Sequence, residues 1–149
     1  MRQEYLTLKE SVDLVMRGID PNDASHCMIH FDEDGEQISG FEYANTGCSE
    51  PPKIVDKDDN FDHSYENDCP IFTIMDVIRL CPSVLKLDIP QDMGGGILKY
   101  KFTISGQENG SFKVGYSVGD NYWFIEFYED ELAHALYKLV CDLIERGLI

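Results

Sequence analysis

Three consecutive stretches in the second half of the chain are typical of β-strands: 98–104 and 112–118 alternate between apolar and polar residues, and 122–128 is rich in aromatic residues. Alternation with a period of two places the apolar side chains of a β-strand on one face. The connections contain Asn109-Gly110 and Gly119-Asp120-Asn121, which are turn-forming sequences. The sequence therefore predicts an antiparallel meander of three strands.

The third of these stretches, residues 122–128, is aromatic or apolar on both faces. A strand that is apolar on both faces is typical of the interior of a covered sheet. We therefore expect it to lie centrally, with helices over at least one side of the sheet.

Three helices are predicted from apolar spacing and capping residues. Residues 7–18 begin with Thr7 and Glu10, a capping box, and residues 73–81 begin with the similar pair Thr73 and Asp76. The clearest helix spans residues 130–146. The apolar stripe of this C-terminal helix is Leu132, Leu136, Leu139, Val140, Leu143 and Ile144. The apolar stripe of the first helix is Leu8, Val12, Val15 and Ile19.

Shorter strands are expected at 27–31, 38–43 and 85–89, and the Asp-Gly turn within 32–35 favours a hairpin between the first two. From 44 to 69 the periodicity disappears, which indicates a long irregular segment. The expected architecture is a single α+β domain over residues 1–149. Its antiparallel meander packs against two or three helices, the C-terminal helix is the longest, and a long acidic loop lies at about 44–69.

Charge is the strongest functional signal, because 28 acidic residues against 12 basic ones give a formal net charge of −16. Such a chain is repelled by nucleic-acid phosphates and by anionic membranes, so we expect neither as a direct partner. Residues 31–70 hold twelve acidic residues against Lys53 and Lys57.

This acidic region has two interpretations: a solvated face, or a surface that binds a basic protein surface. A dense array of carboxylates resembles the phosphate array of DNA, as in inhibitors of nucleic-acid-binding enzymes and in immunity proteins. The candidate partner-binding residues are Asp32, Asp34, Asp56, Asp58, Asp59, Asp62, Glu66 and Asp68.

A divalent cation is the alternative ligand, because four oxygen-bearing residues alternate like the first ligands of an EF-hand loop. Phe61 stands where that loop needs Gly, and Asn67 stands where it needs a bidentate Glu. The four candidate ligands are Asp56, Asp58, Asn60 and Asp62.

A zinc site is a weaker hypothesis. His26 and His30 would lie about 13 Å apart along one strand, and Cys27 would point to the other face. The other zinc-type residues, Cys48 and Cys69 around His63, contain no tight C-x2-C pair. We therefore expect no cofactor.

Catalytic signatures are absent from the sequence, which contains no G-x-S-x-G, P-loop or G-x-G-x-x-G motif. Cys81, Cys141 and His134 fall on or beside apolar helix faces, so a non-enzymatic protein is expected. Five scattered cysteines favour reduced thiols in a cytoplasm. The N-terminus lacks the apolar region of a secretory signal, and no stretch reaches ~18 apolar residues.

Three segments, YLTLKESVDLVMRGID, CPIFTIMDVIRLCP and DELAHALYKLVCDLIERGLI, are similar to segments of small proteins carried by phages and other mobile elements of gut bacteria. The shared features are helix caps, apolar stripes and a glycine stop. The resemblance implies a mobile-element origin and a bacterial cytoplasm. It brings no activity, no catalytic residues and no cofactor.

Overall fold

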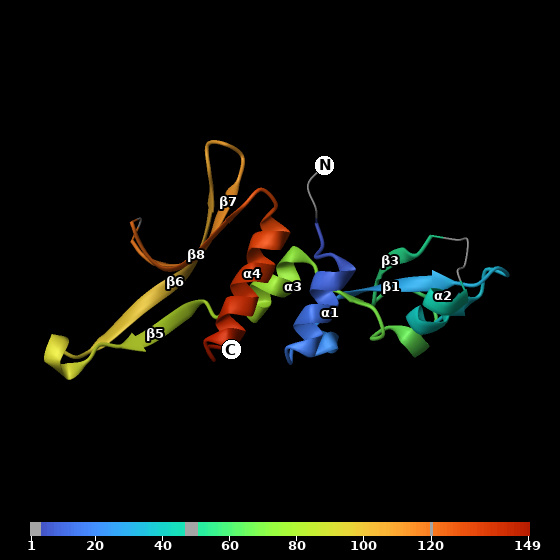
Figure 1. Cartoon of the computed structure of the whole chain (residues 1–149), viewed down its shortest axis with the longest axis horizontal. Helices are drawn as coiled ribbons and strands as arrows, with labels where there is room; N and C mark the ends of the chain where they lie inside the picture. Colours follow the sequence, from blue (N-terminus) through green and yellow to red (C-terminus); the bar gives the residue numbers. More distant parts are fainter. Residues whose placement is uncertain (1–3, 47–50, 120) are drawn as a thin grey trace. The chain divides into compact units, whose positions relative to one another are not determined.

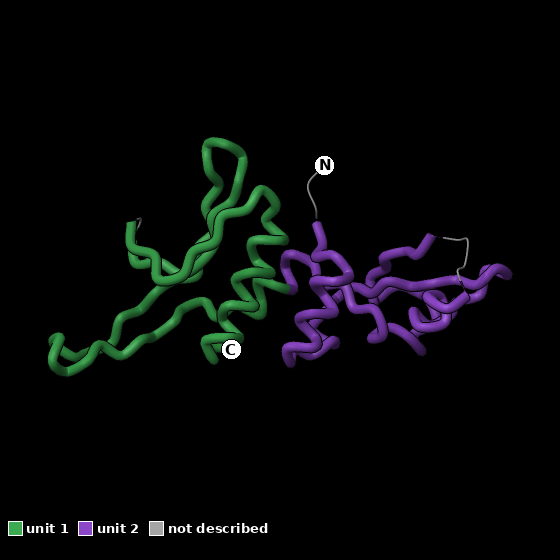
Figure 2. The backbone as a smooth tube through the Cα atoms, in the orientation of Figure 1, with its two compact units in different colours: residues 1–3, 77–149 green, residues 4–76 purple. Residues whose placement is uncertain are grey.

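The computed structural model describes residues 4–46, 51–119 and 121–149, and they form two compact units (Figures 1 and 2). Residues 4–76, purple in Figure 2, are the N-terminal unit, and residues 77–149, green, are the C-terminal unit. Each unit has its own antiparallel sheet, which confirms the α+β fold class. The expected single domain over residues 1–149 stays a prediction.

Helix α1 (Leu8–Met16) begins with the predicted capping box. The Glu10 backbone N–H donates to Thr7 Oγ1 at 3.1 Å, and the Thr7 backbone N–H donates to Glu10 Oε1 at 3.0 Å. The buried face of the helix differs from the predicted stripe, because the fully buried residues are Ser11 and Leu14. The Ser11 hydroxyl accepts a hydrogen bond from the buried Phe72 backbone N–H, which explains a polar residue on this face.

The N-terminal sheet has β1 (His26–Phe31) as its central strand. β3 (Lys53–Asp56) pairs with β1, and β2 (Gln37–Ile38) and β4 (Pro70–Ile71) also pair with it. The predicted hairpin between β1 and β2 is confirmed, and Gly35 takes a positive φ of 79° in its turn.

The strand predicted at 38–43 is wrong beyond Ile38, since α2 (Gly40–Thr46) follows directly. The Glu42 backbone N–H donates to Ser39 Oγ at 3.1 Å, which caps the helix. Ser39-x-x-Glu42 is a capping-box sequence, and its local signal outweighs the apolar residues that resembled a strand.

The segment 44–69, predicted as one irregular loop, carries more structure than expected. It contains the end of α2, strand β3 and a 3-10 turn at His63–Tyr65. β3 was missed because only four residues pair, and their partner strand lies about 25 residues earlier in the chain.

The C-terminal unit contains the predicted meander as a sheet of order β5-β6-β7-β8. α3 (Ile74–Leu80) spans the boundary of the two units and begins with the predicted pair, since Thr73 and Asp76 exchange hydrogen bonds. α4 (Leu132–Glu145) is the longest helix in the described part of the chain. The strands are β5 (Val84–Asp88), β6 (Ile97–Gly106), β7 (Phe112–Val118) and β8 (Tyr122–Glu129).

The predicted central position of residues 122–128 is wrong, because β8 is an edge strand and β7 lies inside the sheet. One face of β8 meets α4, where Arg146 lies over the Phe124 ring and Lys138 pairs with Glu129. On the opposite face, the aromatic rings of Trp123 and Tyr128 contact the Lys113 ammonium group and do not form part of an apolar core. Lys113 Nζ lies 4.2 Å from the ring centroid of Trp123 and 5.1 Å from that of Tyr128.

Candidate functional site

Charge is divided unequally between the two units. Residues 4–76 contain eighteen acidic and four basic residues, a formal net charge of −14. Residues 77–149 contain ten acidic and seven basic residues, a formal net charge of −3. The acidic character of the chain is therefore a property of its N-terminal unit.

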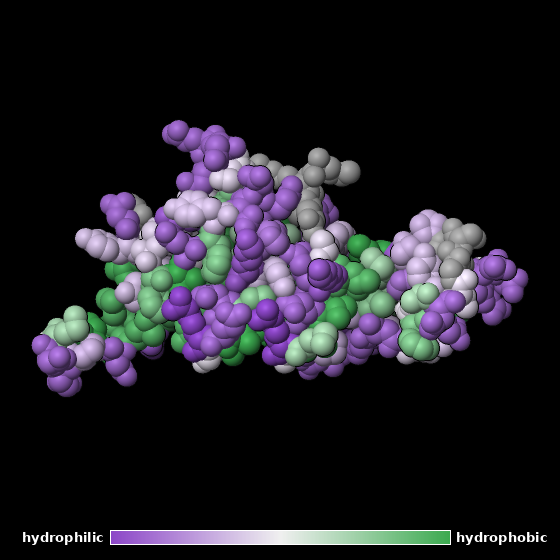
Figure 3. Space-filling view, viewed as in Figure 1, coloured by the Kyte–Doolittle hydropathy of each residue, from purple (hydrophilic) through white to green (hydrophobic). Residues whose placement is uncertain are grey.

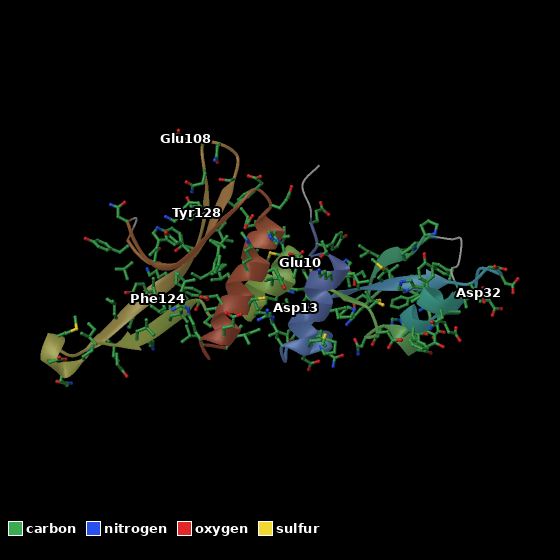
Figure 4. All side chains as sticks on the ribbon, viewed as in Figure 1. Glu10, Asp13, Asp32, Glu108, Phe124 and Tyr128 are labelled. Atoms are coloured by element: carbon green, nitrogen blue, oxygen red, sulfur yellow. The ribbon has the colours of Figure 1, made fainter. Side chains whose placement is uncertain are left out.

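We call the eight predicted partner-binding residues the acidic surface, and the structure buries none of them. Asp32 is labelled at the outer end of the β1–β2 hairpin in Figure 4, and the same end is hydrophilic in Figure 3. The exposed members are Asp34, Asp58, Asp59, Asp62 and Asp68, and the half-buried members are Asp32, Asp56 and Glu66. All eight side chains are thus accessible to water and to a partner.

Three of these carboxylates also shape the backbone through Asx turns. Asp32 Oδ1 accepts hydrogen bonds from the backbone N–H groups of Asp34 and Glu36, both at 2.9 Å. Asp56 Oδ1 accepts the backbone N–H of Asp58 at 2.9 Å. A structural role accounts for part of the acidic surface, independently of any partner.

Asp62 makes the third Asx turn. Its Oδ1 accepts the Ser64 backbone N–H at 3.0 Å and the Ser64 hydroxyl at 2.6 Å. These two hydrogen bonds favour the charged carboxylate and lower the pKa of Asp62 below its ordinary value. Asp62 therefore stays ionised well into the acidic range.

The side-chain amide of Gln37 makes hydrogen bonds that join two segments carrying residues of the acidic surface. Gln37 Nε2 donates to the Asp62 carbonyl at 2.7 Å, and the Asp62 backbone N–H donates to Gln37 Oε1 at 3.2 Å. Gln37 belongs to β2, the second strand of the hairpin whose turn contains Asp32 and Asp34. The structure therefore connects the hairpin to the loop after β3, which the sequence did not predict.

The metal hypotheses gain no support from this geometry. Across 4–46, 51–119 and 121–149, no group of three or more His, Cys, Asp or Glu side chains is arranged to hold a metal ion. Asp56 and Asp62 direct side-chain oxygens to backbone N–H groups, so these two predicted calcium ligands serve local turns. Asp58 and Asn60 are exposed.

The residues of the zinc hypothesis lie in different surroundings. Cys27, His30 and Cys69 are buried, His26 is half-buried, and His63 is exposed and pairs with Glu66 at 2.8 Å. Burial raises the pKa of Cys27 to about 11 and raises that of Cys69. Both thiols are therefore protonated at neutral pH in the metal-free chain. Cys48 lies outside the described residues.

The residues considered for nucleophilic chemistry lie in or beside the core. Burial raises the pKa of the Cys81 thiol to about 12, and Cys141 is buried in α4. A thiol with a raised pKa is a poor nucleophile. His134 is half-buried and stacks on Tyr137, with the ring centroids 6.2 Å apart.

Comparison of the chain with protein-family models, with curated proteins and with solved structures gives no match. Within the described residues, every helix is too short or too polar to cross a lipid bilayer.

Proposed function

We propose that the protein is a non-enzymatic interaction module whose acidic surface binds a basic surface of another protein, in the manner of a DNA-mimic inhibitor or an immunity protein. The observation that carries this proposal is the separation of charge, with −14 of the total −16 in residues 4–76. The resemblance to phage and mobile-element proteins suggests that the partner belongs to a bacterial cytoplasm.

The physical basis is electrostatic steering and complementarity. Like charges concentrated on one unit produce a long-range potential that attracts a basic partner and repels nucleic acid and anionic lipid. Accessible carboxylates on the hairpin and on the loop after β3 supply this potential. The amide of Gln37 links those two segments, so their charges are presented on a fixed scaffold.

The competing interpretation is that the carboxylates only solvate the surface and form turns. Asp→Asn substitutions separate the two, because an Asn side-chain oxygen still makes the Asx turn while the charge is lost. The acidic-surface variant is therefore Asp56→Asn, Asp58→Asn, Asp59→Asn and Asp62→Asn.

A matched control variant removes four charges from exposed positions of the C-terminal unit. It combines Asp88→Asn, Asp92→Asn, Glu108→Gln and Asp130→Asn. Both variants have the same net charge, so any difference between them reports the position of the carboxylates.

The test is affinity purification from cells of the native host, followed by mass spectrometry. We expect the wild type and the control variant to retain the same basic protein at ~50 mM salt and to release it at ~500 mM salt. The acidic-surface variant should not retain it. Equal retention by all three proteins, or no basic protein retained by the wild type, would contradict the proposal.

A further inference from the structure

A pocket of about 630 Å³ lies in the N-terminal unit, between α1, β1, α2 and the segments that precede β3 and β4. Its lining is mainly apolar, and its volume is within the usual range of ligand sites. The lining residues on which the inference depends are His30, Phe41, Tyr43, Ala44, Asp68 and Cys69.

Among the lining residues, His30 is the polar residue that indicates a ligand site. Its side chain is only 5 % exposed, it lines the pocket, and its ring packs on Tyr43 with the centroids 4.6 Å apart. Within the described residues no fully buried side-chain nitrogen or oxygen lacks a hydrogen-bond partner, so a ring nitrogen of His30 that makes no bond within the chain is open to water in the pocket. A ligand group that replaces this water and bonds to the ring can gain affinity.

Burial also lowers the pKa of His30, which favours the neutral imidazole. A neutral imidazole offers one hydrogen-bond donor and one acceptor to the pocket. The neutral His30 ring can therefore accept a hydrogen bond from an N–H group on an apolar ring. Because the ring is uncharged, it does not repel a positively charged ligand.

The backbone of α2 approaches β1 and β4 closely at this site. A Cβ atom on Gly40 would lie 2.6 Å from Cys69 Sγ and 3.5 Å from His30 Cε1, so only glycine fits. This close approach places two aromatic residues of α2 at the pocket. Phe41 lines the pocket and is 80 % exposed, so its ring is accessible to a ligand.

The negative charge around the pocket determines which kind of ligand can bind there. Asp68 lines the pocket, and the whole unit has a formal charge of −14, so anionic ligands are repelled. The pocket thus combines a mainly apolar lining with the negative charge of Asp68 and of its unit, which favours an apolar group carried by a basic segment.

We infer that this pocket binds an aromatic side chain, with tryptophan the best fit, from a basic segment of the partner protein. The indole N–H donates to a ring nitrogen of His30, and Tyr43 and Phe41 contact the indole ring. Flanking Lys or Arg residues pair with Asp68 and the other residues of the acidic surface. The inference rests on the proposed function, because it takes the partner to be basic.

The test is isothermal titration of the full chain with two capped peptides, Lys-Lys-Trp-Lys-Lys and Lys-Lys-Ala-Lys-Lys. We expect the tryptophan peptide to bind at least about tenfold more tightly, as burial of one aromatic side chain implies. The Ala44→Trp variant, which fills the pocket from its exposed edge, should lose this preference. The Asn45→Trp variant, on the next residue but outside the pocket lining, should keep it.

Phe41→Ala provides a second variant on an exposed position, and it should weaken binding of the tryptophan peptide only. Equal affinities for the two peptides, or a preference that survives both Ala44→Trp and Phe41→Ala, would overturn the pocket inference and leave the proposed function standing. Failure of both peptides to bind at low salt would count against the proposed function itself.

Discussion

Asp32, Asp56 and Asp62 each direct a side-chain oxygen to the backbone N–H two residues further on. Each residue therefore contributes to the shape of its loop and to the charge of the acidic surface. These two contributions are separable, because the hydrogen bond needs only an acceptor oxygen whereas steering of a partner needs the negative charge.

The first prediction concerns Asp32, whose Oδ1 accepts two backbone N–H groups in the hairpin turn. Asp32→Ala should lower the free energy of unfolding by about 1 kcal/mol, because both N–H groups lose their partner. Asp32→Asn should lower it by less than half as much. Urea unfolding of the three proteins measures the difference, and equal losses in the two variants would show that the Asx turn contributes nothing.

The second prediction concerns the pH dependence of stability through His30. Burial lowers its pKa in the folded chain below the ordinary value of 6.5, so the unfolded chain takes up this proton at a higher pH. Its contribution to stability is complete above about pH 6.5 and is lost as the pH falls towards the folded-state pKa. His30→Phe should make the free energy of unfolding fall less between pH 7.5 and pH 5, as urea titrations would measure. Parallel profiles would contradict this.

Among the elements, the pairing of β8 with β7 brings their backbones unusually close at Gly115. A Cβ atom on Gly115 would lie 1.9 Å from the Ile125 carbonyl oxygen, so no side chain fits between these strands. Gly115 also lies between Lys113 and Ser117 on the face where Lys113 reaches Trp123. Gly115 therefore allows β7 and β8 to pair closely, and it lies on the same face as the Lys113–Trp123 contact.

The third prediction follows from this contact. Gly115→Ala should lower the free energy of unfolding by on the order of 3 kcal/mol, because the new methyl group meets backbone that cannot move aside. Gly106→Ala is the matched control, since a Cβ there has no atom within 4 Å. Thermal unfolding of both variants provides the measurement, and similar melting temperatures would contradict the account.

Local patterns predicted most of the elements, because a helix cap or an alternating strand is determined by residues close in sequence. Thr7 with Glu10, and the strands of the meander, are of this kind. β8 was placed centrally because both of its faces are apolar. The structure places it at the edge, and Lys113 of β7, not a core, covers Trp123 on one face. The pocket draws on five separate segments and was not predicted, although Ser39-x-x-Glu42 is a local signal for α2.

At the scale of the whole molecule, the unequal charge of the two units has consequences for stability as well as for binding. Eighteen acidic residues among residues 4–76 repel one another in the folded chain. Salt screens this repulsion, because the Debye length falls from about 30 Å at 0.01 M to about 10 Å at 0.1 M.

The fourth prediction is that the melting temperature rises as NaCl increases from ~10 mM to ~300 mM. The rise should be smaller in the acidic-surface variant than in the control variant, because only the former removes charges from the crowded unit. Differential scanning calorimetry checks both statements. Equal rises in the two variants would show that the repulsion is not concentrated in residues 4–76.

If the carboxylates of residues 4–76 bind a basic partner, the dissociation constant for the purified partner must depend on salt and on those carboxylates. Surface plasmon resonance from 50 to 500 mM NaCl would measure it for the wild type, the acidic-surface variant and the control variant. We expect a steep slope for the wild type and the control variant, and weaker binding with a shallower slope for the acidic-surface variant. Three coincident slopes would contradict it.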